Sequence, residues 1–90
     1  MPHPRFSGDQ ISELGEQIYS EELKSTVEVE ENIGKIISID IETHAYEIDD
    51  DIMVTGRRLL AAHPGAAIYG KRIGYNAVYA VGGSLVRTAE

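Results

Sequence analysis

The sequence predicts a single α+β domain in the order α-β-β-α-β-β, with two β-hairpins in a mostly antiparallel sheet and helices on one face. Three observations lead to this fold class. Residues 11–23 carry apolar side chains at helical spacing, residues 35–48 alternate apolar and polar side chains, and a second helical stretch from residue 52 precedes two short strand-like runs. A chain of 90 residues and 9.9 kDa holds one small core, which we place in residues 9–90 behind a flexible N-terminal tail at 1–8.

The first helix is expected to begin after Ser7, because Ser7 and Gln10 have the spacing of a capping box. Its apolar stripe is narrow and drifts around the helix, so the helix needs a partner surface to be stable. Residues 26–29 alternate polar and apolar side chains, which predicts extended chain before a turn at 32–34. The stripe consists of Ile11, Leu14, Ile18, Tyr19 and Leu23.

The segment after this turn predicts a hairpin, because isoleucines alternate with polar residues on both sides of a short polar stretch. A loop of two or four residues around His44 keeps the apolar side chains on one face, whereas an odd-numbered loop mixes the faces. We therefore expect Ile41 opposite Ile48 and Glu42 opposite Glu47. Tight hairpin turns often need a positive φ, and histidine is among the non-glycine residues enriched in that conformation.

The second half of the chain begins with an acidic triplet, Asp49–Asp51, which predicts the N-cap of a second helix. A carboxylate at that position accepts backbone N–H groups and suits the positive end of the helix dipole. The pair Pro64–Gly65 ends this helix. Two strands follow at residues 67–73 and 77–81, and they form the second predicted hairpin.

Composition narrows the class of function. No apolar run approaches the ~20 residues that span a bilayer, and the N-terminus lacks the apolar core of a signal peptide. The absence of cysteine excludes disulfides, thiolate metal sites and a cysteine nucleophile. A net charge of −7 makes nucleic-acid binding an unfavourable interpretation. We expect a cytoplasmic, non-enzymatic protein without cofactor or metal, since no nucleophile–base pair or cofactor motif is present.

Charge is divided unevenly along the chain. Residues 1–51 hold 14 of the 15 acidic residues and three basic ones, whereas residues 52–90 hold five basic residues and one acidic one. One interpretation is that the two halves face each other, within the fold or across a dimer. The other is that the basic half holds an anionic ligand or partner.

A family resemblance rests on the runs IDIET at 39–43, YEID at 46–49 and RIGY at 72–75. With them the chain resembles a family of small uncharacterised bacterial proteins, whose usual pattern is an IDIETGDYEID hairpin, a helix and an RIGY hairpin. The resemblance covers roughly residues 14–83 and implies a companion or antitoxin-like protein, with no settled activity to carry over. At the turn, His44 and Ala45 replace the Gly-Asp of the family.

The leading functional hypothesis concerns an acidic face of the first hairpin. Like charges across a ladder destabilise it, so basic side chains of the second half, a basic protein partner or a divalent cation should offset them. We expect a non-enzymatic protein-interaction module that binds a basic partner through this face. The alternative is a small-molecule or divalent-cation-binding protein, with a site between Arg72, Tyr75 and the acidic hairpin. The acidic face comprises Asp40, Glu42, Glu47 and Asp49.

Self-association is the second functional expectation, as a homodimer or higher homo-oligomer. Aromatic residues are enriched at interface cores, and an open edge strand invites pairing with another chain. Packing within the core of one chain is the alternative role for the same residues. The interface candidates are Tyr69 and Tyr79 from the last hairpin, with Ile18 and Tyr19 from the first helix.

Overall fold

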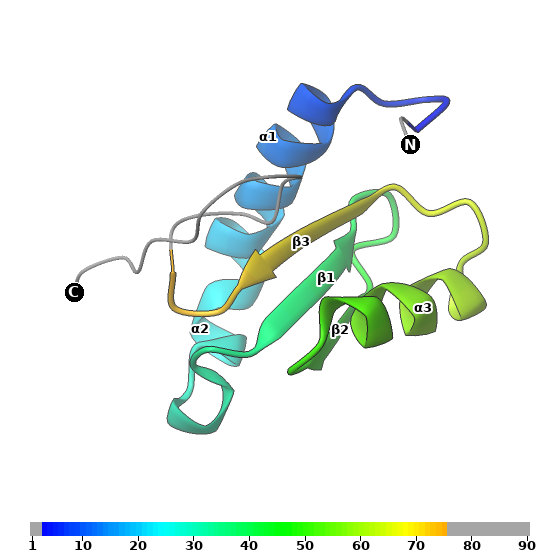
Figure 1. The fold of residues 1–90 in the computed structure, drawn as a ribbon. Coiled ribbons are helices and arrows are strands. Elements are labelled where there is room, and N and C mark those ends of the chain that lie inside the picture. The colour runs from blue at the N-terminus through cyan, green and yellow to red at the C-terminus, as the bar shows by residue number, and fades with distance from the viewer. Residues whose placement is uncertain (1–2, 76–90) are drawn as a thin grey trace.

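The computed structural model describes residues 3–75 of the chain. Within these residues the architecture is a three-stranded antiparallel sheet packed against helices, which confirms the α+β class (Figure 1). We call α1, η1 and α2 together the N-terminal helix, because they form one continuous helical segment. In chain order the elements are α1 (Gly8–Ile18), the π-helical turn η1 (Tyr19–Leu23), α2 (Lys24–Val27), the 3-10 turn η2 (Glu30–Asn32), β1 (Ile36–Asp40), β2 (Tyr46–Asp49), α3 (Ile52–Ala62) and β3 (Ile68–Arg72).

The strand order β2-β1-β3 places β1 at the centre of the sheet. Both outer strands pair with β1 in the antiparallel sense, so they run parallel to each other on either side of it. The chain must therefore return along the whole sheet between β2 and β3, and α3 provides that crossing. Figure 1 shows α3 and the N-terminal helix on opposite faces of the sheet. The prediction that the helices share one face is wrong.

Both faces of β1 are covered, and all five of its residues are buried. Ile37 and Ile39 pack with the N-terminal helix, whereas Ser38 contacts Thr55 of α3. Alternation of isoleucine with Ser38 and Asp40 is typical of a strand with one dry and one wet face. In this fold α3 covers the polar face as well.

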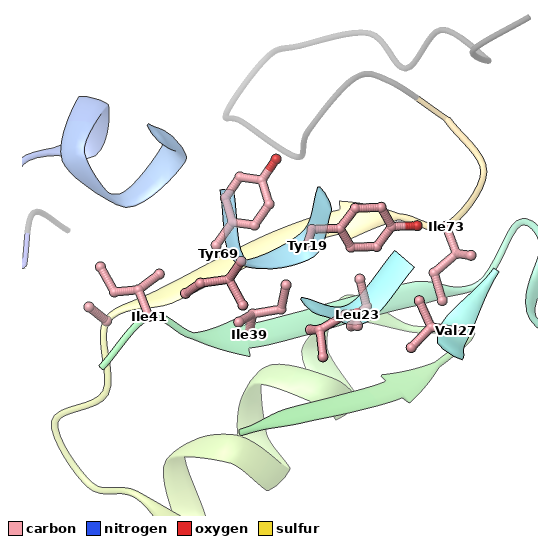
Figure 2. Close-up of a cluster of buried hydrophobic side chains, with 10 residues drawn as sticks. Tyr19, Leu23, Val27, Ile39, Ile41, Tyr69 and Ile73 are labelled. Atoms are coloured by element: carbon pink, nitrogen blue, oxygen red, sulfur yellow. The ribbon is translucent and has the colours of Figure 1, made fainter. Parts of the chain in front are cut away.

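The hydrophobic core lies between the N-terminal helix and the sheet. In Figure 2, Tyr19, Leu23 and Val27 from the helix meet side chains of the strands and the segments that flank them. Phe6, Ile11 and Ile48 pack at its border. The buried cluster consists of Ile18, Tyr19, Leu23, Val27, Ile37, Ile39, Ile41, Ala67, Tyr69 and Ile73.

The N-terminal helix confirms the predicted capping box. Ser7 Oγ accepts a hydrogen bond from the Gln10 amide at 3.1 Å, and Gln10 Oε1 accepts one from the Ser7 amide at 2.8 Å. In η1 the amide of Lys24 donates to the carbonyl of Tyr19, five residues earlier, which shifts the later apolar positions around the axis. The helix continues to Val27, so the expectation of extended chain is wrong for residues 26 and 27.

The β1–β2 register differs from the predicted one by four residues. Ile37 lies opposite Ile48, where Ile41 is expected, and Ser38 lies opposite Glu47, where Glu42 is expected. The shift is even. The side chains that share a face of the hairpin are therefore the ones that the alternation predicts.

The turn between the strands accounts for the shift. The Asp40 amide donates to the Ala45 carbonyl at 2.8 Å, which leaves a loop of four residues, 41–44. Ile41 lies in this loop and cannot pair with β2, although its side chain is buried. His44 has a φ of 66°, which confirms the expected positive φ at the turn.

The second half of the described chain agrees with the prediction in part. Asp51 caps α3 by accepting a hydrogen bond from the Met53 amide at 2.8 Å, and β3 lies within the predicted strand at 67–73. Strand β3 pairs with β1 in the antiparallel sense, which joins it to the sheet of the first hairpin. The fourth predicted strand, residues 77–81, lies outside the described residues. No helix within residues 3–75 has both the length and the apolar character to cross a membrane.

The first described residues contact the body of the fold. His3 Nε2 lies 2.9 Å from the carbonyl oxygen of Gly65, and Arg5 forms an ion pair with Glu42. Phe6 packs against the hydrophobic core. These contacts join the chain before α1 to the β1–β2 loop and to the end of α3.

Candidate functional site

The four predicted acidic-face residues do not form one continuous charged surface. Asp40 is 2% exposed, and its carboxylate accepts hydrogen bonds from the Glu42 amide at 3.0 Å and the Thr43 hydroxyl at 2.9 Å. It is a structural residue of the turn. Glu42 forms an ion pair with Arg5 across the molecular surface.

The two acidic residues of β2 lie on the face that α3 covers. Asp49 Oδ2 lies 3.3 Å from Arg58 of α3, and Asp49 Oδ1 accepts from the amide of Asp50 at 2.7 Å. Glu47 is half-buried opposite Ser38. A basic side chain of the second half therefore offsets Asp49 within one chain, as one interpretation of the charge division expects.

The alternative site residues are engaged elsewhere. Arg72 and Asp49 both lie opposite Ile36, so the central strand separates the arginine from Asp49. Arg72 Nη1 donates to the Gly34 carbonyl at 2.5 Å, and its guanidinium lies 5.8 Å from the centre of the Tyr75 ring. Arg72 therefore lies beside the first strand of the hairpin, but neither of these two contacts is to an acidic side chain of the hairpin.

The predicted interface residues of the first helix and β3 lie inside the monomer. Ile18, Tyr19 and Tyr69 are each at most 5% exposed and hold the N-terminal helix on its own sheet. This is the alternative role considered for them. Tyr79, the fourth candidate, lies outside the described residues.

A polar rim surrounds these tyrosines. The Tyr19 hydroxyl donates to Glu28 Oε2 at 2.6 Å, and the Tyr69 hydroxyl donates to Glu16. The buried Lys71 also contacts Glu16, at 3.4 Å, and its ammonium lies 5.0 Å from the centre of the Tyr19 ring. The contacts of this rim join the N-terminal segment to β3, so we interpret it as part of the helix–sheet attachment.

Burial changes the acidity of both tyrosines. Burial raises the pKa of Tyr19, and its hydrogen bond to Glu28 raises that pKa further. Burial also raises the pKa of Tyr69, with its hydrogen bond to Glu16 as the next cause. Both phenols therefore stay protonated, and act as hydrogen-bond donors, to a higher pH than an exposed tyrosine does.

A pocket lies between the N-terminal helix and the β1–β2 loop, and we call it the helix–loop pocket. Its volume is about 200 Å³. Its walls are partly aliphatic and partly polar, with two carboxylates and one imidazole. The lining residues are Leu14, Gln17, Ile18, Glu21, Glu22, Ile41 and His44.

Local structure explains how the pocket forms. On the helix, Leu14, Ile18 and Glu21 follow one another at helical spacing, so they line one side. On the loop, the positive φ of His44 accompanies the reversal that sets its ring against Glu22, with Nδ1 2.9 Å from Glu22 Oε1. Ile41 is buried at the floor.

Electrostatics make the pocket acidic. Glu21 and Glu22 are exposed, and Glu21 has no ion-pair partner within residues 3–75. Glu22 contacts only the imidazole of His44 among the basic groups of that range. The pocket therefore offers two carboxylates beside an apolar wall, which is the chemistry that receives a long cationic side chain.

Sequence reasoning assigned the residues of this pocket to other roles. Leu14 belongs to the predicted apolar stripe, yet it is 37% exposed and borders the pocket. The buried positions of α1 are Gly15 and Ile18, because Gly15 lies against the Tyr69 ring, and a glycine gives no apolar signal in the sequence. The register of the hairpin was also needed to place Ile41 and His44 beside the helix.

Comparisons with protein-family models, curated proteins and solved structures found no match to this chain. The family resemblance of the two hairpin motifs therefore remains a prediction. Among residues 3–75, no three histidine, aspartate or glutamate side chains are grouped closely enough to hold a metal ion. The assignment of function rests on the geometry of the helix–loop pocket.

Proposed function

We propose that the protein is a protein-interaction module that receives a lysine or arginine side chain of a basic protein partner in the helix–loop pocket. The observation that carries this proposal is the combination of Glu21 and Glu22 with the apolar surface of Leu14 and Ile41 in one hollow. The methylene stem of a lysine or arginine suits the apolar wall, and its charged end suits the carboxylates.

The size of the pocket favours a side chain over a metabolite. Sites for small molecules usually enclose about 300–1,000 Å³. The helix–loop pocket encloses about 200 Å³, which suits one extended side chain anchored by the partner backbone outside. This moves the basic-partner hypothesis from the hairpin face to the junction of the helix and the loop.

Complementary charge supports the same partner class. The N-terminal helix carries further exposed acids near the pocket, including Glu13, and the first 51 residues are strongly acidic. Such a surface attracts a basic partner over several ångströms and speeds association, with a strong dependence on salt. The companion role implied by the family resemblance belongs to this proposal.

The test uses two variants of equal charge. The double substitution of Glu21→Gln and Glu22→Gln removes both pocket carboxylates, and that of Glu30→Gln and Glu31→Gln removes two exposed acids on η2. Partner proteins are captured from a lysate of the host at low salt with the native chain and with each variant. Affinity for the isolated partner is then measured by calorimetry.

We expect the pocket variant to lose at least tenfold in affinity, because each charged hydrogen bond contributes roughly 1.5–3 kcal/mol. The η2 variant should lose much less. Equal losses in the two variants would mean that overall charge, rather than the pocket, determines binding, and the proposal would then be abandoned.

A further inference from the structure

Helix α3 carries an apolar groove on the side that the sheet does not cover. Thr55 and Leu59 face the sheet and are buried, whereas Met53 is 65% exposed and Leu60 is 45% exposed. These two residues are seven apart, so they lie two turns apart on the same side of the helix. Between them is a hollow of about 290 Å³ lined by Ile52, Met53, Gly56, Arg57 and Leu60.

The centre of this groove is open to a second helix. Gly56 has no side chain, and within residues 3–75 no atom outside its own stretch of helix backbone lies within 4 Å of the position that a Cβ would occupy. A glycine at that point lets another backbone approach closely. The aliphatic stem of a long side chain would fill the hollow beside it.

The charges around the groove are complementary to each other. Arg58 forms an ion pair with Asp49 of the same chain. By contrast, Arg57 at the groove and Asp50 before the helix have no ion-pair partner among residues 3–75. A surface that carries one unpaired charge of each sign can satisfy both by meeting a copy of itself around a two-fold axis.

We propose that the α3 groove is the interface of a symmetric homodimer in which two α3 helices pack antiparallel. Met53 of each chain then lies opposite Leu60 of the other, and Gly56 lies opposite Arg57. The same arrangement brings Arg57 of each chain within two turns of Asp50 of the other, a span that an extended arginine covers.

A second copy fits this groove better than the acidic remainder of the molecule fits itself. The first 51 residues hold 14 of the 15 acids, so two copies repel each other over most of their surfaces. Of the two arginines in residues 52–62, Arg58 is already paired with Asp49, so Arg57 is the only unpaired charge that lines the groove among residues 3–75. The proposed interface is independent of the helix–loop pocket, because the two share no lining residue. The groove belongs to α3, which lies on the opposite face of the sheet from the N-terminal helix (Figure 1).

Charge reversal tests the interface by sedimentation equilibrium over a range of protein concentrations. We expect Arg57→Glu and Asp50→Lys each to weaken the dimer at least tenfold, and the double variant to recover to within about threefold of the native dissociation constant. Lys24→Glu is the control, since it reverses an exposed charge on α2, which packs on the other face of the sheet. Far-UV circular dichroism checks that every variant is folded.

Cross-linking provides a second measurement, because the chain has no cysteine of its own. Met53→Cys and Leu60→Cys are made separately, tagged differently, mixed and oxidised. The antiparallel arrangement predicts the mixed disulfide between the two variants in preference to either homodisulfide. A native chain that stays monomeric at all concentrations, a double variant without recovery, or homodisulfides in excess would each overturn the proposal.

Discussion

A single hydrogen-bonded pair joins α3 to the central strand. Ser38 and Thr55 are fully buried, and their hydroxyl oxygens lie 2.7 Å apart. Thr55 donates its only hydroxyl hydrogen to the Ile52 carbonyl at 3.0 Å, so Ser38 must be the donor in the bond between them. Loss of the bond between them would therefore leave the Ser38 hydroxyl without its acceptor, whereas the Thr55 hydroxyl would still donate to Ile52.

This inequality makes a prediction for three variants. Thr55→Val keeps the shape of the side chain but leaves the Ser38 hydroxyl buried without an acceptor, which should lower the free energy of unfolding by about 1–3 kcal/mol. Ser38→Ala should cost less, because Thr55 keeps its bond to Ile52. The double variant should be more stable than the sum of the single effects indicates. Urea unfolding followed by circular dichroism measures all three, and strict additivity would contradict the assignment of donor and acceptor.

The attachment of α1 to β3 depends on a glycine in the middle of a helix. Gly15 is buried, and a Cβ at its position would lie 2.1 Å from an atom of the Tyr69 ring. Glycine weakens a helix interior by about 1 kcal/mol relative to alanine. The close approach of the Tyr69 ring explains why a glycine occupies position 15 despite this cost.

Gly15→Ala should therefore destabilise the protein, although it improves helix propensity. Overpacking of this kind usually costs about 1–3 kcal/mol, because the helix must move away from the strand. Gly8→Ala is the matched control in the same helix, and it should change stability by less than about 1 kcal/mol. Its Cβ would meet no atom of residues 3–75 within 4 Å outside its own stretch of backbone. Thermal unfolding of both variants gives the comparison. A stabilised Gly15→Ala variant would show that α1 does not pack on β3 as described.

Sequence patterns predicted those helix and strand features that depend on residues close together in the chain. The capping residues Ser7 and Asp51 each interact with an amide two or three residues later, so the starts of both helices could be predicted. The π-helical turn has no comparable local signal, and its effect appears only as drift in the apolar stripe. Alternation predicts which side chains of the hairpin share a face. The place of the turn along the chain depends instead on the hydrogen bonds that Asp40 makes within the loop.

At the scale of the whole molecule, the sequence could not show which faces of the sheet are covered. Ser38 and Asp40 are compatible with a solvent-exposed face, and only the crossing of α3 between two parallel strands buries them. The helix–loop pocket was missed for the same reason. Its walls come from Leu14 and from the loop at 41–44, segments whose proximity depends on the sheet order and the register.

The attachment of the N-terminal helix also makes the whole fold sensitive to alkaline pH. Tyr19 and Tyr69 are buried beside Glu28 and Glu16, and Lys71 of β3 contacts Glu16 of the helix. Burial and these carboxylates raise the pKa of both phenols above the ordinary value of about 10. Above that pH the unfolded chain releases the two protons while the folded chain retains them, so the free energy of unfolding must fall as pH rises.

The corresponding measurement is urea unfolding between pH 8 and pH 11 for the native chain and three phenylalanine variants. Tyr19→Phe and Tyr69→Phe should each reduce the loss of stability above about pH 10, because each removes one proton that only the folded state retains. Tyr46→Phe is the control, since Tyr46 is 37% exposed on the edge strand and should leave the pH dependence unchanged. If the double variant of Tyr19 and Tyr69 loses stability as steeply as the native chain, these phenols do not cause the alkaline destabilisation. If it does so less steeply, the contacts between the helix and the sheet limit the stability of the molecule at high pH.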